Sequence, residues 1–417
     1  MVLKRVVVTG IGALTPIGGT LYTFWQNLLA GKSGAAPITL FDATKFKTRF
    51  ACELKNFDPL HFMDRKEARK VDRYCQLALV ASDEAMAHSG IVQSGFNPNR
   101  CGVISASGIG GLITFQEEVM QFALGDGTPR FNPFFIPKMI SDISAGQMSM
   151  RHGLRGPNFS VTSACASSTN AIGVAFDLIR MGKVEMILTG GSEAVVCKAG
   201  VGGFNAMKAL SERNDSPETA SRPYDKDRDG FVMGEGAGML ILEELEYAKA
   251  RGANIICEIA GTGASADAYH ITAPHPEGLG AKNVMIAALA DAGLKPDDID
   301  YINTHGTSTP LGDGAEVKAI QDVFGVHAYN LNISSTKSMT GHCLGAAGVI
   351  EVIACIQSLV HDIVPPTINH FTDDPELDPK LNFTFGQPQK RIVRAALSNT
   401  FGFGGHNACV IVKKYQA

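Results

Sequence analysis

The sequence lacks the marks of a secreted, metal-binding or membrane-spanning protein. Its nine cysteines are scattered, and none forms a C-x-x-C pair, which argues against a disulfide framework or a zinc site. No run of about 18 apolar residues appears, so no transmembrane helix and no membrane partner are expected. The first residues read as a strand and lack the long apolar stretch of a signal peptide. These absences predict a cytoplasmic protein.

The chain also has no excess of positive charge. Its formal net charge is −4, and charged residues make up 19% of its 417 residues. This balance argues against nucleic acid as a partner. Hydrophobic residues make up 45%, enough for a large core in two or three domains or in one two-lobed enzyme.

Short apolar segments alternate with longer helical patterns along the whole chain. This alternation is typical of α/β architecture with buried sheets. Strands are expected at residues 6–9, 102–106, 186–189, 238–242, 256–259, 301–304, 395–397 and 408–412. Helices are expected near residues 21–30, 71–89, 165–181, 280–292, 314–324 and 347–361.

A weak internal repeat accompanies this pattern. Residues 234–242 and 404–412 are both glycine turns that lead into an apolar strand. The repeat is compatible with a duplicated fold divided near residue 256. We therefore expect two similar halves, residues 1–256 and 257–417, packed together as one body.

Two glycine-rich turns invite a nucleotide-binding interpretation. Gly10-Ile11-Gly12 follows the first strand, but the third glycine of a dinucleotide turn is absent, and Pro16 would interrupt the helix that such a site requires. The segment 108–111 fails similarly and indicates a glycine turn beside a pocket. Neither turn predicts a bound nucleotide.

Cys165 is the most informative residue of the chain. It lies between an apolar segment and a helical pattern, which predicts a thiol at a strand-to-helix turn, on the first turn of a helix. The unpaired amides and the positive dipole end of a helix favour the thiolate, which is the nucleophilic form. Small neighbours leave the sulfur accessible. A buried core cysteine is the alternative that residue type alone favours.

Two histidines and a lysine lie in unusual surroundings near the C-terminus. His305 follows a predicted strand, and His342 ends the glycine-containing run that begins at Lys337. Turns at the ends of elements carry the sites of α/β folds. Glu351 begins a strongly apolar helix, so it either faces solvent or pairs with a buried cation, for which Lys337 is the candidate.

Five motifs together resemble those of the β-ketoacyl-acyl-carrier-protein synthases, in the family's order from Val6 to Val412. The motifs are residues 162–168, 223–238, 305–309, 337–342 and 401–405. Within this family the chain is most similar to the free-standing elongating enzymes of class II in dissociated fatty-acid synthesis.

The resemblance implies a thiolase-like fold, with two duplicated halves in a five-layered αβαβα arrangement, and a homodimer. It also implies that Cys165 takes an acyl chain from acyl-carrier protein as a thioester. Malonyl-carrier protein would then lose carbon dioxide, and the resulting enolate would attack the thioester to give a 3-ketoacyl product two carbons longer. His305 and His342 would donate hydrogen bonds to the malonyl thioester oxygen, and Lys337 and Glu351 would orient them.

Other residues match family positions around the reacting groups. The backbone amides of Cys165 and Phe403 would form the oxyanion hole, and Phe403 would act as a mobile gate. Positions that contact the phosphopantetheine arm or the acyl chain are matched by Thr307, Thr309, Ile109, Phe135 and Phe204. The resemblance implies no metal and no cofactor of the enzyme's own, because decarboxylation supplies the energy and phosphopantetheine arrives on the carrier protein.

One segment predicts a positive surface for carrier proteins, which are acidic helical bundles. Four cations at i, i+3, i+4 and i+7 are expected on one helical face: Lys66, Arg69, Lys70 and Arg73. The family binds its carrier proteins at this segment. Arg130 and Lys208 match further basic positions, whereas Phe131 replaces a family cation beside Arg130.

Related classes fit less well. A thiolase would need a second cysteine near the C-terminus as general base, but Cys409 lies in a predicted strand. An initiating synthase would replace one histidine by asparagine. A non-catalytic partner subunit of a polyketide system would lack Cys165. A polyketide ketosynthase would share all of these residues, although the free-standing length favours primary fatty-acid synthesis.

Overall fold

The computed structural model describes residues 3–416, and its main feature is a mixed sheet of ten strands. The strand order is β10-β9-β13-β14-β8-β1-β7-β6-β4-β5. The bounds are β1 Val6–Leu14, β4 Cys101–Ala106, β5 Asn158–Val161, β6 Met186–Glu193, β7 Gly236–Glu244, β8 Cys257–Ala266, β9 Tyr301–Asn303, β10 Asn332–Ser334, β13 Ala395–Gly402 and β14 His406–Lys413. Two small hairpins pair β2 (Ala36–Pro37) with β3 (Phe50–Ala51) and β11 (Ile363–Val364) with β12 (Gln389–Lys390).

The same strand order occurs twice in this sheet. β1-β7-β6-β4-β5 and β8-β14-β13-β9-β10 each begin with two antiparallel pairings and end with two parallel ones. The two sets join where β1 pairs with β8 through Val6–Val8. This is the duplicated architecture that the sequence predicted. We propose that the halves divide at residue 256, directly before β8.

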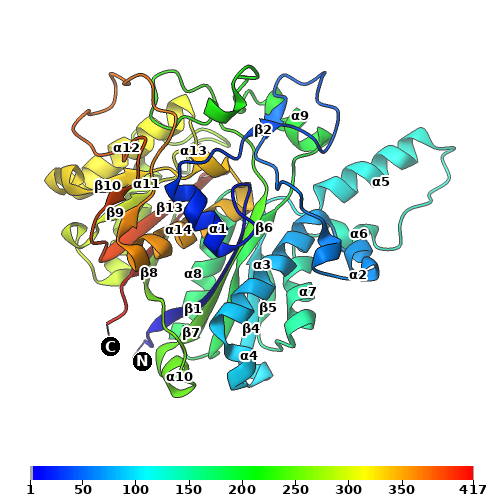
Figure 1. Cartoon of the computed structure of the whole chain (residues 1–417), viewed down its shortest axis with the longest axis horizontal. Helices are drawn as coiled ribbons and strands as arrows, with labels where there is room; N and C mark the ends of the chain where they lie inside the picture. The colour runs from blue at the N-terminus through cyan, green and yellow to red at the C-terminus, as the bar shows by residue number, and fades with distance from the viewer. Residues whose placement is uncertain (1–2, 417) are drawn as a thin grey trace.

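Helices complete a five-layered arrangement around the two sets of strands (Figure 1). The outer layers are α3 (Arg73–Ser89) with α7 (Ile143–His152) on the first set, and α11 (Leu279–Ala292) with α12 (Pro310–Phe324) on the second. The central layer is α8 (Ser167–Arg180) and α14 (Ala347–His361), which contact strands of both sets. The remaining α-helices are α1 Leu21–Leu29, α2 Arg65–Lys70, α4 Ile91–Ser94, α5 Leu112–Leu124, α6 Phe135–Met139, α9 Lys198–Ala206, α10 Leu245–Ala250 and α13 Lys337–Thr340.

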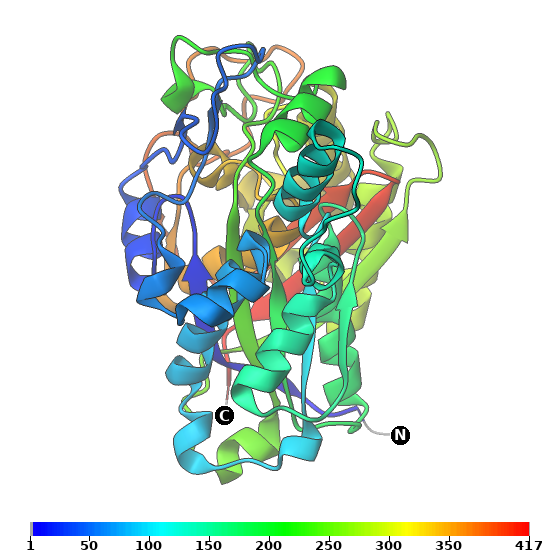
Figure 2. The same cartoon turned by 90° about the vertical axis from the view of Figure 1, so that its right-hand side faces the viewer.

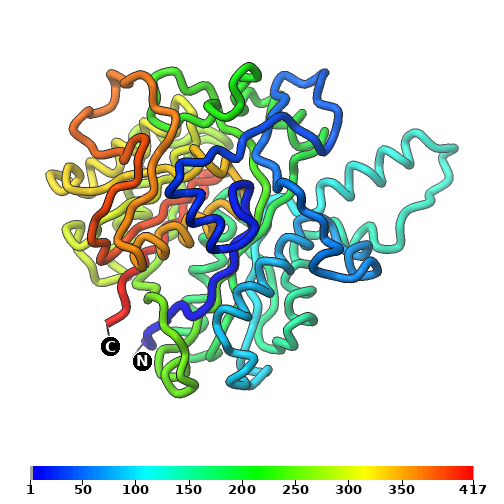
Figure 3. The backbone as a smooth tube through the Cα atoms, in the orientation of Figure 1, coloured from blue at the N-terminus to red at the C-terminus, as the bar shows by residue number. Residues whose placement is uncertain are grey.

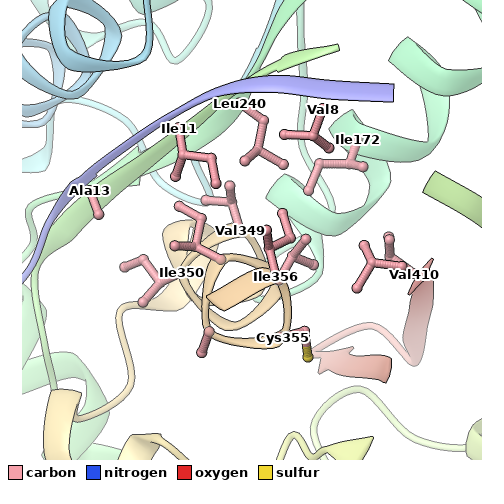
Figure 4. Close-up of a cluster of buried hydrophobic side chains, with 14 of the residues drawn as sticks. Val8, Ile11, Ala13, Ile172, Leu240, Val349, Ile350, Cys355, Ile356 and Val410 are labelled. Carbon is pink, nitrogen blue, oxygen red and sulfur yellow. The ribbon is translucent and has the colours of Figure 1, made fainter. Parts of the chain in front are cut away.

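The central layer holds the largest apolar core. Helix α14 lies at its centre in Figure 4, with side chains directed at strand β1, helix α8 and strand β14. Gly348 lets the two central helices touch, because a Cβ there would lie 1.9 Å from Thr169 Oγ1. The close contact matters for the site, since α8 and α14 each follow a segment that carries a candidate catalytic residue.

The stretch Leu344–His361 is apolar and long enough to cross a membrane by length and composition, although the sequence predicted no such segment. In the structure, 89% of this stretch is buried inside the protein. Strands cover α14 on both sides, which explains why its composition is apolar all round. The stretch is therefore the central core helix of the fold.

All of the expected strands and helices are present, but most of the strands are longer than predicted. Strand β1 continues through Gly10 and Gly12, the residues that resembled a dinucleotide turn. A Cβ on Gly12 would lie 2.0 Å from the carbonyl oxygen of Ala81 in α3, so glycine is needed for helix and strand to pack. Helices α5, α7 and α9 were not predicted.

Two features stand out from the layered body. Helices α5 and α6, with the segment between them, form an arm that projects at the right of Figures 1 and 3. Long connections from three parts of the chain, drawn in blue, green and orange, gather at one end of the molecule, at the top of Figure 2. The green connection, residues 194–235, lines part of the cavity described next.

Candidate active site

Cys165 lies in a tight turn between β5 and α8. Ala164 has a positive φ of 50°, and two side chains of α8 hold this turn: Ser167 Oγ donates to the carbonyl oxygen of Ala164 at 2.6 Å, and Asn170 donates to Ser163 Oγ at 2.7 Å. Helix α8 begins at Ser167. The thiol therefore lies two residues before the helix, not on its first turn, because the strained turn takes up the residues between strand and helix.

The electrostatic setting of Cys165 differs from the sequence prediction. Burial raises the pKa of this thiol to about 12, the Lys337 ammonium lowers it, and the Glu193 carboxylate raises it. The backbone amides of Phe403 and of Cys165 itself point at the sulfur and lower the pKa. The resting thiol is therefore protonated, and two backbone amides are directed at its sulfur.

His305 and His342 lie against one another from different segments of the second half. Their ring centroids are 5.2 Å apart and the rings are nearly perpendicular. Burial, followed by the charge of Lys337, lowers the pKa of both imidazoles well below 6.5, so both are neutral. Nδ1 of each ring is buried without a hydrogen-bond partner among residues 3–416, which leaves Nε2 as the atom that can serve a substrate.

Lys337 and Glu351 form a buried ion pair behind the histidines. The Lys337 ammonium contacts Glu351 Oε1, and the two side chains are 1% and 3% exposed. Burial raises the pKa of Glu351 to about 7, and the Lys337 ammonium opposes this rise. The pairing is the one that the sequence suggested, and it directs a fixed positive charge toward the reacting groups.

Buried carboxylates that sequence reasoning missed hold the His305 loop. Glu316 of α12 accepts from the backbone amides of His305 and Gly306, each at 2.9 Å, and burial raises its pKa to about 7. Asp313, one turn earlier, accepts from the backbone amide of Ser308 at 3.1 Å. Both acids lie in the first half of α12, which directly follows the motif 305–309. Their closeness to this motif in the sequence could have identified them.

These groups meet in one cavity of about 390 Å³. Its lining includes Cys165, Phe204, Lys208, His305, Thr307, Thr309, His342 and Phe403. The Thr307 and Thr309 hydroxyls lie 3.0 Å apart. Phe403 follows the end of β13 and packs against Phe204 with ring centroids 6.3 Å apart. The cavity therefore presents a nucleophile, two imidazoles and a pair of hydroxyls to one ligand.

Comparison with known proteins agrees with this geometry. The model of the β-ketoacyl synthase N-terminal domain matches residues 3–248, and that of the C-terminal domain matches residues 256–371. The chain belongs to the β-ketoacyl synthase family. Similar curated relatives are both called 3-oxoacyl-[acyl-carrier-protein] synthase 2: that of Synechocystis is 50% identical over 413 residues and that of Staphylococcus aureus is 48% identical over 414 residues, with 99% of each chain covered.

Solved structures of ketosynthases share the fold of this synthase. The ishigamide ketosynthase/chain length factor aligns with a TM-score of 0.92 at 33% identity, and a β-ketoacyl synthase from Burkholderia phymatum aligns with 0.91 at 35%. A structure of a type II polyketide ketosynthase, bound to the hexaketide and in complex with its acyl-carrier protein, aligns with a TM-score of 0.91 at 32% identity. Each covers 99% of this chain and 100% of the other.

Two predicted acyl-pocket residues of this synthase lie outside the cavity. Ile109 lines a separate shallow hollow between α5 and α6 and does not line the cavity that holds Cys165. Phe135 lies on the arm, stacked between Phe115 and Phe131. Of the three predicted acyl-pocket residues, Phe204 alone lines the cavity within one protomer. Phe135 is distant from the cavity because the arm projects away from the body of the protein.

The prediction that four cations share one helical face is wrong. Helix α2 ends at Lys70, and Val71 is extended, so Arg73 belongs to α3 and points elsewhere. Arg73 pairs with the fully buried Glu235 at 2.7 Å and has a structural role. Asp72 begins the new helix by accepting a hydrogen bond from the amide of Tyr74. The spacing of the cations alone did not predict this break between the two helices.

Five of the predicted docking cations are exposed. They are Lys66, Arg69, Lys70, Arg130 and Lys208. The Lys70 ammonium lies 5.9 Å from the ring centroid of Phe134, which joins α2 to the arm, and Lys208 lines the cavity. Phe131, in place of a family cation, packs against Phe122 with ring centroids 5.3 Å apart and the rings tilted by 34°, so the arm is apolar beside Arg130.

Proposed function

We propose that the chain is an acyltransferase, a 3-oxoacyl-[acyl-carrier-protein] synthase that elongates acyl chains by two carbons through decarboxylative condensation with malonyl-carrier protein. The observation that carries this proposal is the meeting of the Cys165 thiol with two neutral imidazoles in one buried cavity. Full-length identity of 50% to a curated 3-oxoacyl-[acyl-carrier-protein] synthase 2 supports the same reaction.

In the first step the Cys165 sulfur attacks the thioester carbon of an acyl-carrier protein. The new C–S bond forms as the bond to phosphopantetheine breaks, and the amides of Cys165 and Phe403 hold the oxyanion. Because the resting thiol is protonated, a base must accept its proton. The departing phosphopantetheine thiolate can accept it, so the proton leaves on the carrier protein and both imidazoles keep their Nε2–H groups for the second step.

In the second step malonyl-carrier protein binds in the same cavity and loses carbon dioxide. Nε2–H groups of His305 and His342 stabilise the enolate oxygen, and the buried Lys337 adds positive charge behind them. The enolate carbon attacks the acyl carbon, and the C–S bond to Cys165 breaks. The released thiolate then takes up a proton from solvent, because its first proton left on the phosphopantetheine thiol. Cleavage of the malonyl C–C bond drives the step, so we propose that the enzyme needs no metal or redox cofactor.

Fatty-acid synthesis is favoured over a polyketide pathway. The polyketide ketosynthase with its acyl-carrier protein is 32% identical to this chain, whereas the two 3-oxoacyl-[acyl-carrier-protein] synthases are 50% and 48% identical. A non-catalytic partner role is disfavoured because Cys165, His305 and His342 are all present in one cavity.

The enzyme acts as a cytoplasmic homodimer that receives its substrates from carrier proteins. Support for the dimer comes from the exposed edge strand β5 and from apolar residues exposed on the neighbouring arm: Phe115, Phe122, Phe131, Phe134 and Ile136. Exposed apolar residues gathered in one place on a surface mark interaction sites. Support for carrier-protein docking comes from the exposed cations of α2 and from Lys208 at the cavity. Phosphopantetheine would enter past the Thr307 and Thr309 hydroxyls.

Intact mass spectrometry tests the proposal directly. Incubation with a long-chain acyl-carrier protein should add one acyl group to the protein and none to the Cys165→Ala variant. Addition of malonyl-carrier protein should then release a 3-ketoacyl product. A folded protein that gains no acyl mass would overturn the proposed reaction.

A further inference from the structure

Glu193 is a buried acid at the C-terminal end of β6 that the proposed mechanism does not use. Its side chain is fully buried and accepts four hydrogen bonds. Oε1 accepts from Ser107 Oγ at 2.8 Å and from the amide of Ile109 at 3.3 Å. Oε2 accepts from the amides of Gly108 at 2.8 Å and Gly345 at 3.0 Å.

The four donors come from two segments that border the reacting groups. Residues 107–109 follow β4 and carry Ile109, and Gly345 lies three residues after His342. The segments are in backbone contact, since a Cβ on Gly345 would lie 2.3 Å from the amide nitrogen of Gly108. One carboxylate therefore joins the Ile109 loop to the segment that bears a catalytic imidazole.

The nucleophile turn packs on the same junction. A Cβ on Gly108 would lie 3.2 Å from the carbonyl oxygen of Ala164, the residue before Cys165. Thr162 Oγ1 also donates to the carbonyl oxygen of Ser107 at 3.2 Å. A shift of the Ile109 loop would therefore move the backbone on which the thiol is placed.

The hydrogen-bond pattern stabilises an ionised carboxylate and opposes the effect of burial, which raises the pKa of Glu193. All four partners donate, and Ser107 Oγ is itself used as an acceptor by the amide of Gly110 at 2.9 Å. A carboxylic proton on Glu193 would have to displace one of these donors. A negative charge is consequently fixed close to Cys165, and it raises the pKa of the thiol.

We propose that Glu193 is a positioning residue for the reaction at Cys165, which fixes the Ile109 loop, the segment after His342 and the nucleophile turn relative to one another. The proposal rests on the proposed function. An uncharged or shorter side chain at this position loses at least one pair of donors, because the oxygens of one carboxylate bind two donors each.

The test compares two reactions of Cys165 in the full-length Glu193→Gln variant. Transfer of an acyl group from acyl-carrier protein should fall about tenfold or more, the scale expected for misplaced reacting groups. Alkylation by iodoacetamide, followed at the Cys165 peptide by mass spectrometry across pH, should instead become severalfold faster at neutral pH, because loss of the negative charge lowers the thiol pKa. Opposite changes in the two rates are the signature of the proposed role.

Glu243→Gln is the matched control. Glu243 is also fully buried and pairs with Arg251, but it lies at the other end of the paired strands β6 and β7, where it faces Met186. Its variant should lose stability and leave both rates of Cys165 unchanged. Glu193→Gln rates equal to wild type, or a parallel fall in both rates, would overturn the proposal.

Ser107→Ala keeps the test decisive if Glu193→Gln fails to fold, because it removes one of the four donors and leaves the charge. Acyl transfer should then fall severalfold with no faster alkylation, and unchanged acyl transfer would overturn the proposal. Since alkylation uses no acyl substrate, its result is independent of the proposed function. Failure of the wild-type protein to accept an acyl group would contradict that function instead.

Discussion

The two halves of the molecule share one strand order but carry different chemistry at matching positions. In the first half, β5 leads through the Cys165 turn into the central helix α8. In the second half, the matching strand β10 leads through Lys337 and His342 into the central helix α14. The same place in the fold thus holds a nucleophile in one half and an imidazole with its buried cation in the other. A duplicated scaffold fixes where groups meet, and the local sequence decides what they do.

A second matching pair of loops shows how each half holds its part of the site. The loop after β4 is fixed through its amides by the buried Glu193, and the loop after β9 is fixed through its amides by the buried Glu316. Both acids accept from two consecutive backbone amides. Only the second of these loops carries an imidazole, so the shared device serves positioning rather than chemistry.

The connections between the last two strands of each half along the chain differ most. Between β6 and β7 the chain makes the long excursion 194–235, which supplies Phe204 and Lys208 to the cavity. Between β13 and β14 it makes a tight turn at Phe403, with Gly404 and Gly405 at positive φ of 88° and 75°. The first half therefore covers the cavity, and the second half presents a small turn to the nucleophile.

Removing the chemistry of one half at a time should separate the two steps of the reaction. Cys165→Ala should abolish the acyl-enzyme while retaining decarboxylation of malonyl-carrier protein. His305→Ala or His342→Ala should lower decarboxylation about 10²–10³-fold, since a preorganised donor to a developing oxyanion is lost, and should affect acyl transfer less. Carbon dioxide release and acyl-enzyme mass, measured on each variant, check this division; the reverse pattern would contradict the assignment of the halves.

Breaking the buried pair of the second half should cost stability as well as rate. Lys337→Ala leaves Glu351 buried and uncompensated, so the free energy of unfolding should fall by about 3–5 kcal/mol. A double variant, Lys337→Met with Glu351→Leu, should recover most of that loss in denaturant titrations while decarboxylation stays slow. Recovery of activity together with stability would show that the pair has no electrostatic part in the reaction.

Substitution of a cation on either side of the α2–α3 break should distinguish docking from structure. Arg69→Glu lies on the exposed face of α2 and should raise KM for carrier-protein substrates about tenfold at low salt, through a slower encounter. KM for small acyl thioesters should be unchanged, and so should the melting temperature.

Arg73→Ala is the comparison for that experiment. It leaves the fully buried Glu235 without its partner and should lower the free energy of unfolding by about 3 kcal/mol. Equal effects of Arg69→Glu on carrier-protein and small thioester substrates would remove the docking assignment of α2.

The last comparison concerns a pH dependence carried by Glu316. Burial raises the pKa of this carboxyl from 4.5 to about 7, so between these pH values the folded protein retains a proton that the unfolded chain releases. Stability contributed by this group therefore falls as pH rises from about 4.5 to 7. In Glu316→Gln the slope of melting temperature against pH over this window should be shallower than in wild type; an unchanged slope would contradict the shift.

Motifs and apolar periodicity allowed much of this molecule to be predicted from its sequence. The positions of β1, β9, α8 and α14 follow from local hydrophobic patterns, which neighbours in sequence determine. Cys165, His305, His342 and Lys337 could be identified because they lie in short runs rich in glycine and small residues. The pairing of Lys337 with Glu351 followed from the presence of one acid on an otherwise apolar helix.

Tertiary structure alone decided the features that depend on residues distant in sequence. The thiol of Cys165 is protonated because a buried cavity removes it from water, although the end of a helix nearby suggested a thiolate. Arg73 left the docking face because Glu235, from a remote segment, takes its charge. The role of Glu193 could be recognised only from the structure, which shows the backbone amides that bind it. The local hydrophobic pattern determines the helices and strands, whereas burial and long-range hydrogen bonds determine the protonation states and the positions of the side chains in the site.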